Sequence, residues 1–223
     1  MRANAVGRTA MAAKKSRRSA RQQRRERQFE RTREDILEAA GKAFARKGYR
    51  GTTMEEIASE AGYGVASLYT YFKSKTLIFD ALVLSFVGEL FATFEETPHP
   101  GSLEEKLCQL YRAQFEVAER RRETFAFFMR LAAGIEAVPD AGKKRGAKAE
   151  PNAFPLRLGA WLEQHAQMGE LGKLDPVTAA FALWGTSNGL VRMWMEESPD
   201  KKLGEYTELI VDLSLRGIQG SRG

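Results

Sequence analysis

The side chains best suited to chemistry are basic and lie at one end of the chain. The first 33 residues carry twelve lysine and arginine side chains against two glutamates, whereas the rest of the chain carries 23 basic and 27 acidic groups. The whole excess of positive charge, +6 overall, therefore comes from an N-terminal arm. Such an arm is typical of proteins that bind a polyanion, either nucleic acid or an acidic membrane surface.

Residues that usually carry catalysis or bind metals are scarce. With two histidines, His99 and His165, and one cysteine, Cys108, the sequence shows no Ser-His-Asp constellation, metal-ligand spacing or phosphate-cradling glycine loop. We therefore expect no enzyme activity, no metal and no cofactor. The arginines are not followed by the apolar stretch of a secretory signal, and no run approaches about 18 apolar residues. We expect a cytoplasmic protein with no membrane partner.

The positions of the prolines favour an all-α protein. Residues 1–97 contain no proline, and the seven prolines lie between Pro98 and Pro199. Because proline is poorly tolerated inside helices, these residues mark boundaries between long helical stretches. No strand-like alternation or Asn-Gly hairpin signal is present. We expect about nine helices.

Polar cap residues mark where several helices begin. Four such starts are Thr32, Thr53 and Ser102, each with Asp or Glu three residues later, and Asp175, which is followed by proline. The first helix is expected to end in a left-handed C-cap at Gly48. Ser74 should cap a long apolar helix. The polar segment 137–151 is expected to be a mobile loop.

Residues 53–72 have the spacing of a helix-turn-helix. That motif needs a small residue where two helices cross, a turn residue that accepts a left-handed backbone, and an inward apolar residue on the second helix. Ala58, Gly62 and Leu68 hold these places. An ordinary helical hairpin would show the same three residues.

The longer stretch TTMEEIASEAGYGVASLYTYFKSKTLIFDAL resembles the N-terminal domain of the TetR (tetracycline-repressor-like) family of bacterial transcription regulators. The residues that carry the resemblance are Thr53, Ile57-Ala58, Ala61-Gly62, Leu68-Tyr69, Phe72, Lys75 and Leu77, after a helix that ends in Gly48-Tyr49. The likeness covers residues 32–85. After the basic arm (1–31), it implies a three-helix helix-turn-helix DNA-binding domain (32–78) and a helical ligand-binding and dimerisation domain (79–223).

The resemblance also assigns contacts to a double-stranded DNA operator. Base-edge contacts in the major groove fall to Val65, Ala66, Ser67 and Thr70, and phosphate contacts fall to Thr53, Tyr69, Tyr71 and Lys75. Val65 and Ala66 carry no hydrogen-bonding side-chain group, so they read only thymine methyls or DNA shape. Gly64 stands where the family often has a serine or threonine cap, which puts that cap and its phosphate contact in doubt.

The arm has two interpretations. Residues 16–31 are rich in arginine, glutamine, alanine and glutamate, which are good helix formers, but repulsion between like charges opposes order. We therefore expect the arm to fray in the free protein and, on DNA, to add phosphate contacts or reach a minor groove. The alternative is a solvated tail.

The second half suggests a sensor for a small-molecule effector. Aromatic residues and a few polar ones are candidates to line a cavity for a largely apolar or aromatic ligand, although most such residues are ordinary core. The candidates are Phe94, Tyr111, Phe115, Phe128, Trp161, His165, Trp184 and Asn188.

The last two helices are candidates for a dimer interface. Small residues on one face of helix 176–197 would let a second copy approach closely, and a monomer would leave an apolar face exposed. The predicted interface residues are Ala179, Ala182, Thr186 and Gly189, with Tyr206, Ile210 and Leu213 on the last helix. The resemblance implies the same homodimer.

These observations predict a homodimeric, sequence-specific DNA-binding repressor that a small molecule releases. Two alternatives from other classes remain open: a non-specific protein that compacts nucleic acid through its basic arm, and a small helical enzyme.

Overall fold

The computed structural model describes residues 3–96, 101–132, 153–166, 170–171, 174–197 and 201–219. Over these residues it contains nine α-helices and one short 3-10 helix, with no strand. The all-α prediction is therefore confirmed. The predicted mobile loop 137–151 lies outside the described residues.

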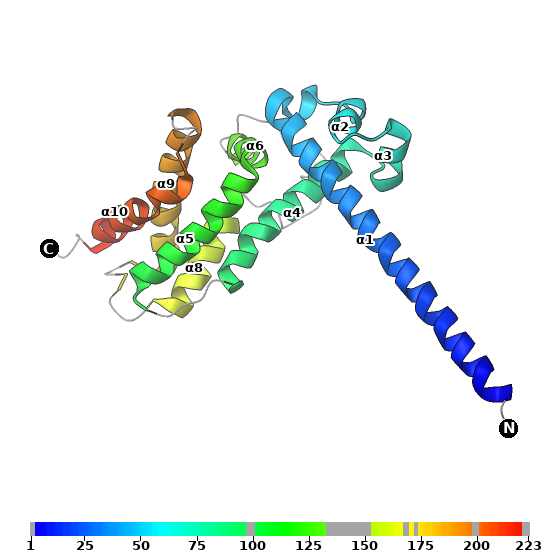
Figure 1. Cartoon of the computed structure of the whole chain (residues 1–223). Coiled ribbons are helices and arrows are strands. Elements are labelled where there is room, and N and C mark those ends of the chain that lie inside the picture. Colours follow the sequence, from blue (N-terminus) through cyan, green and yellow to red (C-terminus); the bar gives the residue numbers. More distant parts are fainter. Residues whose placement is uncertain are drawn as a thin grey trace.

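The helices form two groups joined by one long helix (Figure 1). Their bounds are α1 (Ala3–Gly51), α2 (Met54–Glu60), α3 (Val65–Tyr71), α4 (Lys75–Glu96), α5 (Leu103–Arg120), α6 (Arg122–Ala132), α8 (Ala153–His165), α9 (Pro176–Glu197), η1 (Leu203–Tyr206) and α10 (Thr207–Gln219). Helices α2 and α3 lie beside the C-terminal half of α1, and α4 runs from them to the second group. The N-terminal half of α1 projects away from the rest of the molecule.

Three predicted helix starts are confirmed at atomic detail. Thr53 and Ser102 each form a full capping box with the glutamate three residues later. The Asp175 carboxylate accepts hydrogen bonds from the backbone N–H groups of Val177 and Thr178, at 3.1 and 3.0 Å. These caps satisfy N–H groups that a helix start otherwise leaves unpaired, which is why they fix where the helices begin.

The predicted helix start at Thr32 is wrong, because α1 continues through Thr32, from Ala3 to the kink at Gly48. Thr32 is buried inside the helix, where its hydroxyl accepts a 3.5 Å hydrogen bond from the Gln28 amide. No glycine or proline separates residues 16–31 from the next turn, so their helix propensity carries the helix through the capping sequence. The boundary between arm and domain at residues 31 and 32 therefore falls within a helix.

The predicted role of Gly48 is only partly confirmed. Its φ of 72° requires glycine, but its ψ of 167° is extended rather than left-handed helical. The chain therefore kinks at Gly48 before Gly51.

Two apolar cores lie toward the two ends of α4, which contributes Ile78 and Leu82 to the first and Phe94 to the second. The first joins α1, α2, α3 and the start of α4, and includes the fully buried Ile36, Phe44 and Leu68. Phe127 of α6 is also part of this first core, although α6 follows the long connection through α4 and α5. The second core joins α5, α8, α9 and α10 around residues such as Trp194.

Helix α4 corrects the expectation that no run in the chain approaches about 18 apolar residues. Residues Lys75–Glu95 are long and apolar enough to cross a membrane, by length and composition alone. Ile78, Leu82 and Phe86 of this helix are buried within the protein. One such helix is weak evidence for a membrane span, because the core helix of a soluble protein passes the same test.

Candidate nucleic-acid interface

The helix-turn-helix residues lie as their spacing predicts. Ala58 and Leu68 are fully buried, and Gly62 has the positive φ of 74° that the turn requires. The backbone N–H of Tyr63 donates to the carbonyl of Ala58 at 2.9 Å, which closes the turn. The Tyr63 hydroxyl donates to the Asp35 carboxylate at 2.8 Å and ties the turn to α1.

Helix α3 presents most of its surface to solvent. Leu68 anchors it, while Ala66, Ser67, Tyr69 and Thr70 are exposed. The predicted base contacts Val65, Ala66, Ser67 and Thr70 thus lie on one short helix, with Val65 partly covered. Because seven residues span only about 10 Å, α3 fits within a single major groove. The assignment of individual bases stays a prediction.

The start of α3 lacks a side-chain cap, as the glycine at position 64 predicts. Gly64 is the N-cap, and no side chain makes a cap hydrogen bond there. Its carbonyl accepts from the Leu68 N–H at 3.0 Å, so the helix is closed by the backbone alone.

The Thr53 hydroxyl caps α2 and keeps an O–H group that can donate a further hydrogen bond. Its hydroxyl oxygen accepts from the Glu56 N–H at 3.2 Å, while the Glu56 carboxylate accepts from the Thr53 N–H at 3.0 Å. A threonine hydroxyl that accepts one hydrogen bond still has its own O–H to donate. Thr53 is exposed at the start of α2, so that O–H is available to a phosphate.

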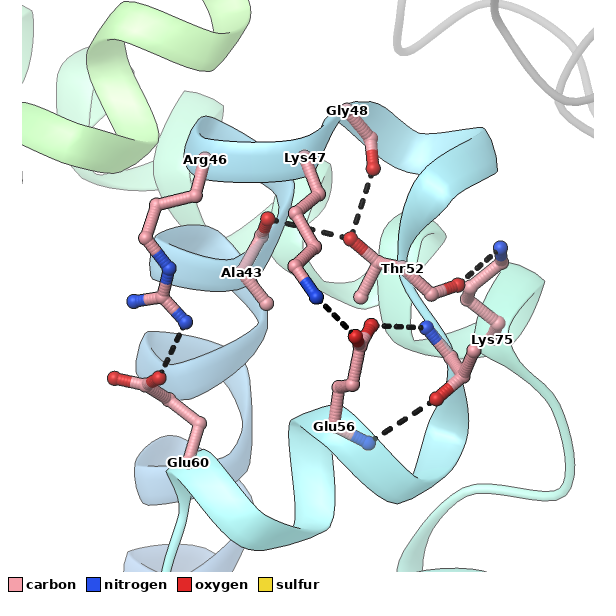
Figure 2. A network of polar contacts seen from close by, with 9 residues as sticks. Ala43, Arg46, Lys47, Gly48, Thr52, Glu56, Glu60 and Lys75 are labelled. Atoms are coloured by element: carbon pink, nitrogen blue, oxygen red, sulfur yellow. Dashed lines mark hydrogen bonds and ion pairs between the residues drawn. The ribbon is translucent and has the colours of Figure 1, made fainter.

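Lys75 occupies a position that the sequence did not predict. Its ammonium donates to the carbonyls of Tyr49 at 2.7 Å, Thr52 at 2.5 Å and Arg50 at 3.4 Å, and it lies 4.5 Å from the centre of the Tyr49 ring. Figure 2 shows the contact with Thr52. An ammonium has three N–H donors, and the carbonyls that follow the kink take all three. Partial burial lowers the pKa of Lys75. Its phosphate contact stays a prediction, but the structure shows that it ties the start of α4 to the α1–α2 connection.

Two of the three glutamates of α2 are matched by bases at the end of α1 (Figure 2). Arg46 donates to Glu60 at 2.5 Å, and Lys47 pairs with Glu56. The hydrogen bond from Lys47 lowers the pKa of Glu56, and that from Arg46 lowers the pKa of Glu60. Both carboxylates therefore stay charged and paired at neutral pH, which reduces their repulsion toward an approaching phosphate.

Two aromatic contacts join α1 to the far end of α3. The Phe29 ring lies 4.7 Å from the Tyr71 ring, and the Arg33 guanidinium lies 5.0 Å from the Phe72 ring. Sequence reasoning missed Phe29 and Arg33. Phe29 lies seven residues before Ile36, a spacing of two helical turns on the face that carries the core, and this spacing was the signal available.

The eight residues predicted to line an effector cavity do not come together. Phe94, Tyr111, Phe115 and Trp161 belong to the second core, and the His165 ring stacks on Trp161 at 4.5 Å. Phe128 stacks on Phe86 and packs against the first core, and Trp184 lies outside the second core beside Phe181, so their place in an effector site stays a prediction. Asn188 is partly buried on α9.

The second half shows a surface groove elsewhere. It has a volume of about 510 Å³, lies between α5 and α10, and is lined mainly by polar residues that include Glu104, Arg112 and Asp212. None of the eight predicted residues lines it.

The predicted dimer residues divide into two classes. Ala179 and Ile210 are fully buried within the chain, so the prediction is wrong for both. Ala182, Gly189 and Leu213 are exposed, whereas Thr186 and Tyr206 are partly exposed. Large apolar side chains that the prediction missed are exposed on the same two helices: Val177, Phe181 and Leu209.

Known transcription regulators resemble this chain in sequence. Residues 36–82 match the family described as "Bacterial regulatory proteins, tetR family". Over 168 residues the chain is 27% identical to the HTH-type transcriptional regulator YhgD of Bacillus subtilis (strain 168), covering 74% of this chain and 84% of YhgD. It is 31% identical over 108 residues to the HTH-type transcriptional repressor KstR2 of Mycolicibacterium smegmatis, covering 48% of this chain and 53% of KstR2.

Solved structures extend the likeness to the second half. The TetR-family regulator PfmR from Thermus thermophilus superposes with a TM-score of 0.65 at 25% identity, covering 81% of this chain and 97% of PfmR. The regulator FadR from Bacillus subtilis, solved in complex with stearoyl-CoA, shares the fold with a TM-score of 0.68 at 22% identity, covering 82% of this chain and 98% of FadR. The matched residues 36–82 contain the helix-turn-helix described above, and the superpositions, which cover 81% and 82% of this chain, include much of the helical second half. Residues 36–82 therefore match the DNA-binding domain of the tetR family of bacterial regulatory proteins, and the chain shares the fold of TetR-family regulators.

Proposed function

We propose that this regulator is a homodimeric repressor in the cytoplasm that holds a DNA operator through α3 and releases it when a small, largely apolar molecule binds the second half. The observation that carries the proposal is the exposure of α3 around one buried anchor, Leu68. A helix held in this way offers its outward side chains to a groove. The repressor KstR2 and the named regulators among the relatives support a role in transcription rather than catalysis.

The exposed residues of α3 contribute differently to DNA sequence preference and to affinity. Ser67 and Thr70 carry hydroxyls that either donate to or accept from base edges, so they contribute to sequence preference. Tyr69, 42% exposed, is suited to a phosphate, which positions the protein without reading sequence.

Selection of bound duplexes from random DNA tests this proposal. We expect one enriched sequence with two related half-sites, as a two-fold dimer requires. Thr70→Val should lower the preference between the selected duplex and its single-base variants by roughly tenfold. Tyr69→Phe should instead weaken binding to all of these duplexes alike. A protein that enriches no sequence would be a non-specific DNA binder, and the proposal would fail.

The second core offers few polar groups to an effector. Tyr111 and Gln114 of α5 are at least nine-tenths buried, and among the described residues the Gln114 amide nitrogen has no hydrogen-bond partner, like the Tyr111, Thr207 and Ser214 hydroxyls. Burial raises the pKa of the Tyr111 hydroxyl, although the neighbouring Ser187 side chain opposes the shift. A buried donor without a partner is costly. We infer that the effector is apolar over most of its surface and carries an acceptor for Gln114.

Helix α6 connects the two halves. Its Arg130 donates to the carbonyls of Phe44 and Ala45 at 3.2 and 2.9 Å, at the C-terminal part of α1. A Cβ added at Gly41 of α1 would lie 2.2 Å from the Thr124 hydroxyl oxygen, so the two helices touch closely. A shift of α6 would therefore move α1 and, through the Tyr63–Asp35 bond, the turn before α3.

Gly41→Ala tests this connection. The new methyl group should push α6 away from α1, because overpacking a close contact costs about 1–3 kcal/mol. We expect operator binding about tenfold weaker, with the preferred sequence and the oligomeric state unchanged. The double variant Gly41→Ala with Thr124→Ala, which removes the obstructing oxygen, should recover most of the affinity.

Gly51→Ala is the matched control for that experiment. Its new Cβ would lie 3.5 Å from the Lys47 Cβ, an ordinary contact, so binding should change little. If Gly41→Ala and Gly51→Ala bind the operator equally well, the contact between α1 and α6 does not set the position of α3.

A further inference from the structure

The N-terminal part of α1 is a helix without a protein partner over the residues that the structure describes. Residues 21–31 are all exposed, and this part of α1 projects beyond the body of the molecule (Figure 1). Along α1 from its free end, the first described contact with another element is the Phe29–Tyr71 ring pair. Residues 1–27, the part of the arm that precedes this contact, carry ten basic side chains and one glutamate.

Positive charge covers more than one side of this helix. Arg24, Arg27 and Arg31 follow one side at spacings of three and four residues, and Arg21 and Arg25 lie four apart on another. One ring, Phe29, is the large apolar residue of this stretch, and it lies against Tyr71. A helix that lies on a membrane or in a protein groove needs an apolar face. The charge pattern instead fits a polyanion that contacts the helix through charge alone.

The arm leaves the molecule at the edge of the DNA-reading helix. Phe29 packs on Tyr71, the last residue of α3, and Arg33 lies over the next residue, Phe72. When α3 occupies a major groove, its ends lie close to the phosphate backbones that border the groove. The arm therefore starts beside the duplex that α3 reads.

We propose that the arm is a second DNA-binding element, which lies against the phosphates of the duplex that flanks each half-site. The proposal rests on the operator binding proposed above. At 1.5 Å per residue, the helix from Ala3 to Gln28 is about 39 Å long, enough to follow roughly 11 base pairs. Phosphates of DNA would also remove the repulsion between the arginines, so the bound arm is a more stable helix than the free one.

The charge balance of the chain should make the contribution of the arm to DNA affinity large. Without its arm the chain would carry a net charge of about −3 and would approach DNA against an unfavourable overall field. Each phosphate that the arm neutralises releases counterions and steepens the fall of log K with log salt by about 0.9. An arm that neutralises four phosphates would steepen the slope by about 3.6.

The test compares three proteins on the duplex selected for the full chain. The first is the full chain, and the second lacks residues 1–27 but keeps Phe29 and its contact with Tyr71. The third keeps the full length with Arg17, Arg18, Arg21, Arg24, Arg25 and Arg27 changed to glutamine, which preserves helix propensity while removing charge. Affinity is measured at several salt concentrations, on the half-sites alone and with about 11 base pairs added on each side.

We expect the full chain to have the steepest salt slope and to gain affinity from the added flanks. The truncated protein and the glutamine variant should both have slopes flatter by about 3.6 and gain nothing from the flanks. All three should prefer the same operator. Equal slopes for the three proteins would overturn the proposal, as would a full chain that binds anionic vesicles while its slope on DNA matches that of the truncated protein. Loss of sequence preference in the full chain itself would instead reject the operator binding.

Discussion

Gly189→Trp should convert the protein from a dimer into a monomer and weaken operator binding at least about 100-fold. The second effect follows from the first, because two linked reading heads gain a factor of about 10² to 10⁴ over one head by binding together. The loss should therefore appear on a duplex with two half-sites and be small on a duplex with one.

The structure makes this substitution a clean test. A Cβ added at Gly185 or Gly189 meets no atom within 4 Å in the part of the protomer that the structure describes, so a larger side chain has room within the chain. Val177 and Phe181 lie exposed on the same helix, and Leu209 and Leu213 lie exposed on α10. Large apolar side chains gathered on two adjacent helices are typical of a surface that another chain covers. A tryptophan at 189 would hold the second copy away from this surface.

Sedimentation gives the oligomeric state, and the matched control is Gly88→Trp. Gly88 is also an exposed helical glycine with no atom within 4 Å of an added Cβ, but it lies on α4. The control should remain dimeric and bind the operator normally. A Gly189→Trp protein that is still fully dimeric would place the interface on another surface.

The sequence predicted best those features that depend on neighbours in the chain. The caps at Thr53, Ser102 and Asp175 satisfy backbone donors within three residues, so their side chains locate helix starts without knowledge of the fold. The turn at Gly62 is local in the same sense. Thr32 failed because a cap competes with continuation of the helix, and the residues before it favour continuation.

Features that depend on which face of a helix meets another element were harder to predict. Small residues on α9 indicate close packing but do not identify the partner. A Cβ added at Gly159 of α8 would lie 3.2 Å from the Val177 Cα, so α8 approaches α9 closely within one chain. Ala179 is consequently buried inside the protomer, and the exposed face carries Phe181 instead.

The same reason explains why the sequence did not predict the surroundings of the effector-site candidates or the contacts of Lys75. Aromatic residues such as Phe128 have the composition of a cavity lining, yet α6 places this ring against the first core. The family pattern gave Lys75 a phosphate, but it carried no information about the carbonyls that the kink at Gly48 leaves facing the start of α4. Such contacts between distant segments are set by the tertiary fold.

Lys75→Met should lower the melting temperature by several degrees and weaken operator binding with little change in the salt slope. Methionine keeps the length and apolar stem of the side chain but cannot donate to the carbonyls of Tyr49 and Thr52, which Lys75 now contacts at 2.7 and 2.5 Å. One lost bond from a charged donor costs about 2 kcal/mol, which corresponds to roughly 4–8 °C for a chain of this size. The start of α4 would then loosen from the α1–α2 connection, and α3, which directly precedes α4, would be held less firmly.

Lys73→Met is the matched control for this last prediction, because Lys73 is exposed and donates to the Tyr69 carbonyl alone among the described contacts, at 2.8 Å. Its melting temperature should stay within about 1 °C of the unchanged protein, since surface substitutions usually alter stability by less than about 0.5 kcal/mol. Thermal unfolding and salt-dependent operator binding, measured on both variants, separate the two roles of Lys75. A Lys75→Met protein with an unchanged melting temperature and a salt slope lower by about 0.9 would show that the ammonium serves a phosphate, not the carbonyls.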